Sequence, residues 1–168
     1  MARKAGRQTT GPLARPARRS GRLTFGQYLD FRLGHGARRR WFNFFIRPFG
    51  ARSFAEFWRL WNPVYGYFLV YFVYRPASRR MPRPVAVMLT FVACGLVLHD
   101  LPAWLFTRRI LPPGATIAFT FFGIGVVVTE ALRMNLARWP VLVRAAVNLT
   151  YLAGSVGAML LIVSRIVR

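Results

Sequence analysis

Acidic residues are almost absent from this sequence of 168 residues, which contains four Asp and Glu against 25 Lys and Arg. Lysine is scarce, so arginine carries nearly all of the positive charge. The single cysteine, Cys94, excludes an intramolecular disulfide and a cysteine metal cluster built from this chain alone. No zinc-ligand spacing or nucleic-acid motif accompanies the net charge of +21, so we expect no nucleic-acid partner and no metal.

The N-terminal residues lack the apolar core of a signal peptide. Residues 1–22 contain seven basic residues but almost no large apolar side chain, so burial cannot offset the entropy lost on ordering. We expect this segment to be a basic, disordered, cytoplasmic tail. Residues 23–62 interleave aromatic and arginine side chains, a mixture too charged to cross a bilayer. We expect them to lie at the membrane interface, with rings buried and guanidinium groups toward lipid phosphate.

Long apolar runs are abundant, and all of them follow Asn62 in a chain that is 55% hydrophobic. Three of these runs, residues 85–106, 115–132 and 141–163, have the length of about 20 residues that a membrane-spanning helix needs. Proline and glycine mark the breaks between them. The sequence therefore predicts an all-α integral membrane protein with a membrane domain at 63–168 and about three transmembrane helices.

A further apolar run, Val64 to Tyr74, has only eleven residues, so we interpret it as a short interfacial or re-entrant helix. If it does not cross, 21 basic residues lie on one side of the membrane and four on the other, whereas crossing gives 18 and seven. The positive-inside rule favours the first arrangement, with a cytoplasmic N-terminus. Usage rich in alanine and arginine, with scarce lysine, is compatible with a bacterial inner-membrane protein, which is the location we expect.

Ionisable groups within a span are costly, so His99, Asp100 and Glu130 are the candidates for function. Glu130 lies three residues before Arg133, and this spacing predicts an ion pair on one helical face. Asp100 points about 100° away from its neighbour His99 on a helix, so it is not expected to orient the imidazole. An imidazole exchanges a proton near neutral pH, as the activation of a hydroxyl nucleophile requires. A lone histidine in a helix is more often structural.

Small residues four apart occur twice in the last span, as Gly154 with Ala158 and Ala153 with Gly157. Such pairs let another helix approach closely. They are equally explained by the ordinary frequency of glycine in membrane helices.

The run SFAEFWRLWNPVYGYF from Ser53, the basic loop after it and the run ACGLVLHD ending at Asp100 resemble the C-terminal half of the membrane-bound O-acyltransferase family. The resemblance covers roughly residues 53–104. It implies that His99 is the family's histidine and that Asn62 is the second active-site position, in a tunnel where an acyl thioester meets a hydroxyl acceptor. The chain departs from the family in two ways. It has only three spans, whereas the family's usual members have many more helices, and its histidine is flanked by Leu98 and Asp100 instead of the commoner tryptophan and glycine.

The resemblance implies an O-acyltransferase, or its histidine-bearing half, with acyl-coenzyme A or another acyl thioester as co-substrate and no tightly bound cofactor. A partner subunit or a second copy would complete the membrane chamber. Four arginines of the basic loop are candidates for binding a phosphate-bearing donor, although membrane topology alone also explains them: Arg75, Arg79, Arg80 and Arg83.

Two other interpretations remain open. The chain is alternatively a non-catalytic membrane subunit derived from the same family, within a larger complex. In the third interpretation the helices are only an anchor, and the basic arm recruits an acidic partner or anionic lipid.

Overall fold

The computed structural model describes residues 22–168, so the expected disordered tail lies outside the described residues except for Arg22. The described part is 78% helical and has no strand. Its elements, in chain order, are α1 (Phe25–Leu33), α2 (Ala37–Phe45), the 3₁₀ helix η1 (Arg47–Gly50), α3 (Phe54–Leu60), α4 (Pro63–Phe68), the π-helix η2 (Leu69–Tyr74), α5 (Arg75–Ser78), α6 (Arg83–Gly95), the π-helix η3 (Leu96–Asp100), α7 (Leu101–Thr107), α8 (Gly114–Ala131) and α9 (Val141–Ile166).

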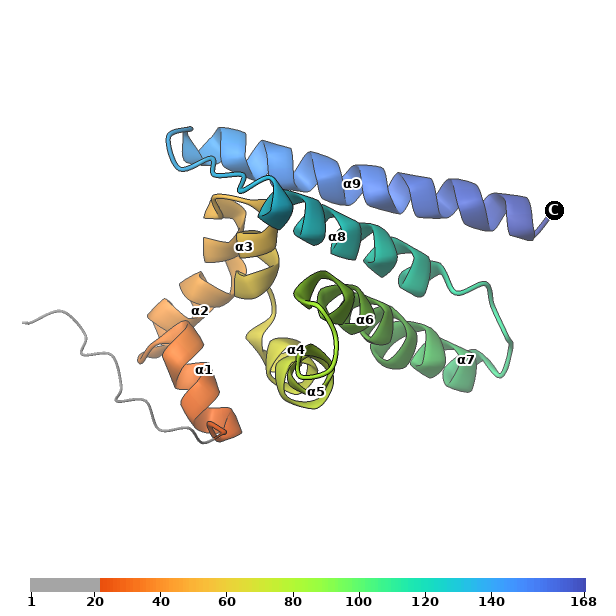
Figure 1. Cartoon of the computed structure of the whole chain (residues 1–168), viewed down its shortest axis with the longest axis horizontal. Coiled ribbons are helices and arrows are strands. Elements are labelled where there is room, and N and C mark those ends of the chain that lie inside the picture. Colours follow the sequence, from red (N-terminus) through yellow and green to blue (C-terminus); the bar gives the residue numbers. More distant parts are fainter. Residues whose placement is uncertain (1–21) are drawn as a thin grey trace, which may run out of the picture.

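Three helices of the described chain are long and apolar enough to cross a bilayer. They are the continuous helix α6–η3–α7 over Arg83–Thr107, helix α8, and helix α9, and they run across the view in Figure 1. The sequence placed the corresponding spans at 85–106, 115–132 and 141–163. The prediction of an all-α integral membrane protein with three spanning helices is confirmed.

Each of the two π-helical segments ends two residues before a proline. Segment η2 ends at Tyr74 before Pro76, and segment η3 ends at Asp100 before Pro102. A proline inside a helix removes one hydrogen bond, and its ring clashes with the carbonyl four residues earlier. A wider π turn relieves this clash while the helix continues. As a result, the side chains that follow each π-helical segment point to a different face of the helix than they would in an uninterrupted α-helix.

Helices α4, η2 and α5 form one continuous segment over residues 63–78, which is not among the three spanning helices. Figure 1 views α4 and α5 nearly end-on, whereas α6 to α9 run across the picture. The segment therefore lies crosswise to the spans and contacts α6 through η2. This arrangement agrees with an interfacial or re-entrant helix.

Helices α6 and α8 approach each other at backbone distance. A Cβ atom at Gly95 would lie 2.6 Å from the Cα atom of Thr116, so only glycine fits there. At Gly123 a Cβ atom would meet the side chains of Met88 and Phe91 at 3.0 and 3.1 Å. These two contacts fix how α6 crosses α8.

Helix α3 belongs to the core of the membrane domain. Phe54 and Phe57 are only 4% and 1% exposed, and they pack in one cluster with Phe122 of α8. The 3₁₀ helix η1 contacts α9, where the buried Asn148 donates its Nδ2 hydrogen to the carbonyl of Ala51 at 3.3 Å. The end of the segment that we assigned to the interface therefore packs inside the domain.

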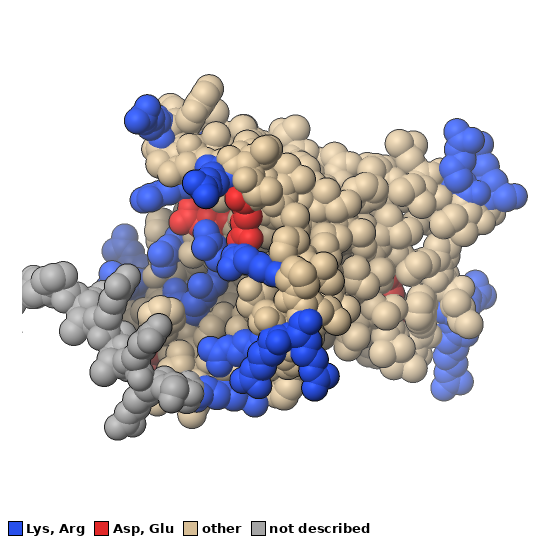
Figure 2. All heavy atoms as spheres, viewed as in Figure 1, with Lys and Arg blue, Asp and Glu red and all other residues tan. Residues whose placement is uncertain are grey.

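Basic side chains gather at the two ends of the molecule, with a broad belt nearly free of charged side chains between them (Figure 2). The end that holds the C-terminus and the α7–α8 turn carries four basic residues: Arg108, Arg109, Arg165 and Arg168. All other basic residues of the described part belong to the residues just before α1, to α1–α5 and the segments joining them, to the α5–α6 loop, to the first residue of α6, to the α8–α9 loop or to the first turn of α9.

Candidate functional site

A cavity of about 710 Å³ lies among α1, α3, α4, η2, α6, η3 and α8. Both residues that the sequence singled out for catalysis, Asn62 and His99, line it. Most of the wall is apolar, including Val87, Phe91 and Phe119. The fold thus brings residues from seven elements to one hollow within the membrane domain.

His99 lies in the π turn η3 and is half-buried. Its Nδ1 atom is 3.0 Å from the carbonyl oxygen of Cys94. A carbonyl can only accept, so Nδ1 carries the hydrogen and donates it. In the neutral ring this leaves Nε2 as the acceptor, which is the tautomer that a general base needs. The ring of Phe119 lies 4.7 Å away and that of Tyr65 lies 6.2 Å away, centroid to centroid.

Asn62 has a clear structural role. It adopts a left-handed conformation with φ 34°, and its side-chain oxygen accepts a hydrogen bond from the backbone N–H of Tyr65 at 3.3 Å. Asparagine is among the residues that adopt this conformation and cap helices well. Its side-chain NH₂ has no hydrogen-bond partner among the described residues. Asn62 therefore caps α4 and still has donors to offer at the cavity wall.

The carboxylate of Asp100 forms no hydrogen bond with the ring of His99. This carboxylate is buried and accepts hydrogen bonds from the backbone N–H groups of Ala115 and Thr116, at 3.0 and 2.7 Å. The hydroxyl of Thr116 adds a third bond at 2.6 Å. These donors belong to the first turn of α8, where a negative charge is favoured by the exposed N–H groups. Asp100 thus ties η3 to the start of α8.

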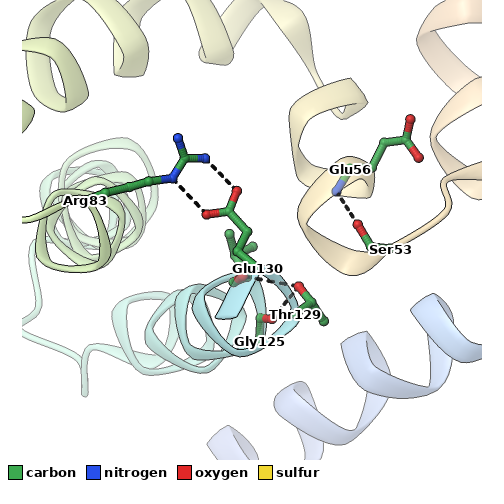
Figure 3. Close-up of polar contacts among 7 residues, drawn as sticks. Ser53, Glu56, Arg83, Gly125, Thr129 and Glu130 are labelled. Carbon is green, nitrogen blue, oxygen red and sulfur yellow. Dashed lines mark hydrogen bonds and ion pairs between the residues drawn. The ribbon is translucent and has the colours of Figure 1, made fainter. Parts of the chain in front are cut away.

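Glu130 pairs with a different arginine from the one we expected. Instead of Arg133, its carboxylate accepts two hydrogen bonds from Arg83 at the start of α6, at 2.7 and 3.0 Å (Figure 3). Arg133 has a left-handed backbone, with φ 50°, because α8 ends at Ala131. The prediction assumed that both residues lie on one helical face, but the helix ends before Arg133. Arg83 and Glu130 both line the cavity.

The basic loop contributes one arginine to the cavity. Of the four candidates for donor binding, Arg83 lines it, whereas Arg75, Arg79 and Arg80 do not. The guanidinium of Arg75 instead covers the ring of Tyr71, at 4.2 Å from the centroid. Two arginines outside the loop also line the cavity, and the loop argument did not identify them as ligand-binding residues: Arg32 of α1 and Arg59 of α3.

A second hollow, a shallow apolar groove of about 730 Å³, lies on α8 and α9. Gly154 and Ala158 line it, together with Ser155 and Tyr151. A Cβ atom at Gly154 or Gly157 would meet nothing within 4 Å, so these glycines do not serve packing inside this chain.

The side chains that line the main cavity supply one imidazole, one amide, one carboxylate, one thiol, several hydroxyls and three guanidinium groups. Within residues 22–168, no three His, Cys, Asp or Glu side chains lie close enough to hold a metal ion. The comparisons with known proteins add no assignment, since no family model, curated protein or solved structure matches this chain.

Proposed function

We propose that this chain is a membrane-bound O-acyltransferase, or its histidine-bearing half, which transfers an acyl group from a thioester donor to a hydroxyl acceptor. The observation that carries the proposal is the state of His99. Its Nδ1–H bond to Cys94 leaves Nε2 as a proton acceptor at the wall of a cavity that Asn62 also lines.

The proposed reaction begins with His99. Nε2 removes the proton of the acceptor hydroxyl as its oxygen attacks the thioester carbonyl. The new C–O bond forms, the C–S bond breaks, and the protonated imidazole returns its proton to the departing thiolate. The side-chain NH₂ of Asn62 hydrogen-bonds a substrate oxygen and holds it for attack. Acyl-coenzyme A, or another acyl thioester, is the co-substrate.

The proposed orientation places the N-terminal, arginine-rich end in the cytoplasm. In the described part, only four basic residues lie at the opposite end of the spanning helices. The positive-inside rule assigns the richer end to the cytoplasmic side. A bacterial inner membrane is the proposed location, in line with the residue usage.

A partner subunit or a second copy completes the chamber in this proposal. The chain supplies three spanning helices, and α9 leaves its small-residue face unoccupied. In the bilayer such a face permits close packing of another helix. The assembled chamber would enclose the reacting groups away from water.

The second candidate is a non-catalytic membrane subunit of the same origin, and the cap at α4 favours it. Asn62 satisfies the backbone N–H of Tyr65, so a subunit without catalytic function also has a physical use for this residue. The simultaneous presence of Asn62 and His99 therefore does not by itself decide for an enzyme.

The two candidates are distinguished by acyl transfer from labelled acyl-coenzyme A in membranes that contain the wild-type chain, alone and with its co-purifying proteins. An acyltransferase gives labelled product in at least one of the two preparations, in proportion to the amount of chain. Absence of transfer in both, with abundance and partners unchanged, would leave the structural subunit as the better account.

A further inference from the structure

All four carboxylates of the chain already have partners. Asp30 pairs with Arg40, and Glu130 pairs with a residue of α6. Asp100 caps α8, while Glu56 accepts a hydrogen bond from a backbone N–H at 2.6 Å. The whole sequence has four acidic residues against 25 basic ones, so most of the arginines have no side-chain carboxylate as counter-ion. Their counter-anions must come from outside the chain.

Two of these arginines, Arg32 and Arg59, line the main cavity. Arg32 is half-buried, and its guanidinium lies over the ring of Tyr28 at 5.8 Å, which holds the head group near the wall. Neither arginine forms an ion pair in the described structure. Two unpaired guanidinium groups beside one hollow are suited to an anion of more than one charge.

The rest of the cavity is suited to hydrocarbon. Val87, Phe91 and Phe119 line it between the arginine-rich end and the imidazole of His99. His99 lies 16 residues beyond the first residue of α6, or about 24 Å along a helix. Figure 1 places α1 and α3 toward the end opposite the C-terminus. A cavity with cationic groups at one end and an apolar wall beyond them fits an amphiphile.

We propose that this cavity binds a phosphate-bearing amphiphile, whose phosphate lies at Arg32 and Arg59 and whose apolar chain lies along α6 and α8 toward His99. A phosphate monoester carries about −1.5 to −2 charges at neutral pH and presents several acceptor oxygens, which two guanidinium forks bind well. Arg83 is not the main anion site, because Glu130 already neutralises it.

This inference names the ligand class of the proposed acyl-transfer site, and it depends on that function only for the ligand's later fate. The same chemistry is available from two sources. A lysophospholipid would enter from the bilayer, and a phosphate-bearing thioester would enter from water. Binding is measurable without turnover, so failure of the binding site and failure of catalysis give different results.

The test uses the full chain in nanodiscs of neutral phosphatidylcholine. The probe is a lysophosphatidic acid with a diazirine near the end of its acyl chain, and a monoacylglycerol with the same chain is its neutral counterpart. Crosslinked peptides are mapped by mass spectrometry. The variant R32Q/R59Q is compared with R38Q/R39Q, which removes the same charge from two exposed arginines of α2 that do not line the cavity.

The proposal predicts crosslinks on the parts of α6 and α8 that line the cavity, at least about tenfold weaker in R32Q/R59Q than in R38Q/R39Q. The neutral probe should label these peptides weakly. Competition by unlabelled lysophosphatidic acid or by acyl-coenzyme A identifies the source. Equal labelling in both double variants, or labelling confined to lipid-facing surfaces such as the α9 groove, would overturn the proposal.

Discussion

The two walls of the main cavity are held together in different ways. Helices α6 and α8 meet at backbone distance at Gly95 and are tied by the three hydrogen bonds of Asp100. Helix α1 rests on α4 through ring contacts, such as Phe25 on Tyr67 at 5.3 Å and Tyr28 on Tyr67 at 5.4 Å. The first wall carries His99, and the second carries Arg32. Close packing of helices thus fixes the position of His99, whereas a looser set of ring contacts positions the charge of Arg32.

The largest predicted effect comes from disrupting the close contact between α6 and α8. Gly95→Ala places a methyl group against the backbone of Thr116, so we expect a loss of about 3 kcal/mol in the free energy of unfolding. Reversible unfolding in mixed micelles measures it. The matched control is Gly154→Ala, where nothing lies within 4 Å of the new atom. That variant should be unchanged or up to about 1 kcal/mol more stable, because alanine favours a helix. Equal effects would contradict this account of the wall.

The second effect removes the polar tie in the same wall. Asp100→Ala leaves two partly buried N–H groups of α8 without their acceptor, and we expect a loss of about 2 kcal/mol. Asp30→Ala, which breaks the exposed pair with Arg40, should cost less than about 1 kcal/mol. The same unfolding assay compares them. If Asp30→Ala lowered the free energy of unfolding more than Asp100→Ala, the contacts of α1 and α2, and not the α6–α8 wall, would govern stability.

A third, smaller effect separates capping from catalysis at Asn62. Asn62→Ala removes the cap of α4 and should cost about 1 kcal/mol. Asn62→Asp keeps an oxygen for the N–H of Tyr65 and tolerates the left-handed backbone, so stability should return to nearly that of the wild type. It lacks the NH₂ donor, so acyl transfer should remain low. Recovery of both properties in Asn62→Asp would restrict Asn62 to a structural role.

The smallest effect concerns the ion pair of Arg83 and Glu130. A double-mutant cycle with Arg83→Gln and Glu130→Gln should give a coupling of roughly 0.5 to 1 kcal/mol, because the arginine side chain is 61% exposed and well screened. Unfolding of the wild type, the two single variants and the double variant supplies the four values. A coupling above about 3 kcal/mol would show that the pair, and not Gly95, holds the wall together.

Sequence reasoning found the three spans because each is a long apolar run bounded by proline or glycine. It also indicated correctly that Asp100 would not face His99, which followed from helix geometry. The actual partners of Asp100 lie 15 and 16 residues later, across the α7–α8 turn. No local spacing rule reports such a contact. Only the folded chain shows that this carboxylate caps α8.

The arginines that line the cavity could not be chosen from sequence. The loop arginines form the denser cluster, but the fold brings Arg32 and Arg59 to the cavity from two separate helices. The expected pair of Glu130 with Arg133 was wrong because α8 ends at Ala131 and the backbone turns. Helix ends and contacts between distant helices depend on packing, which a list of local patterns does not contain.

The most direct test of the central claim compares acyl transfer by His99→Ala and His35→Ala, in membranes where the wild-type chain is active. His35 is the only other histidine and is exposed outside the cavity. If His99 is the general base, His99→Ala at equal abundance should lose about 10²- to 10⁴-fold in rate, while His35→Ala keeps the wild-type rate. Full activity in His99→Ala, with the protein present at wild-type level, would contradict the account.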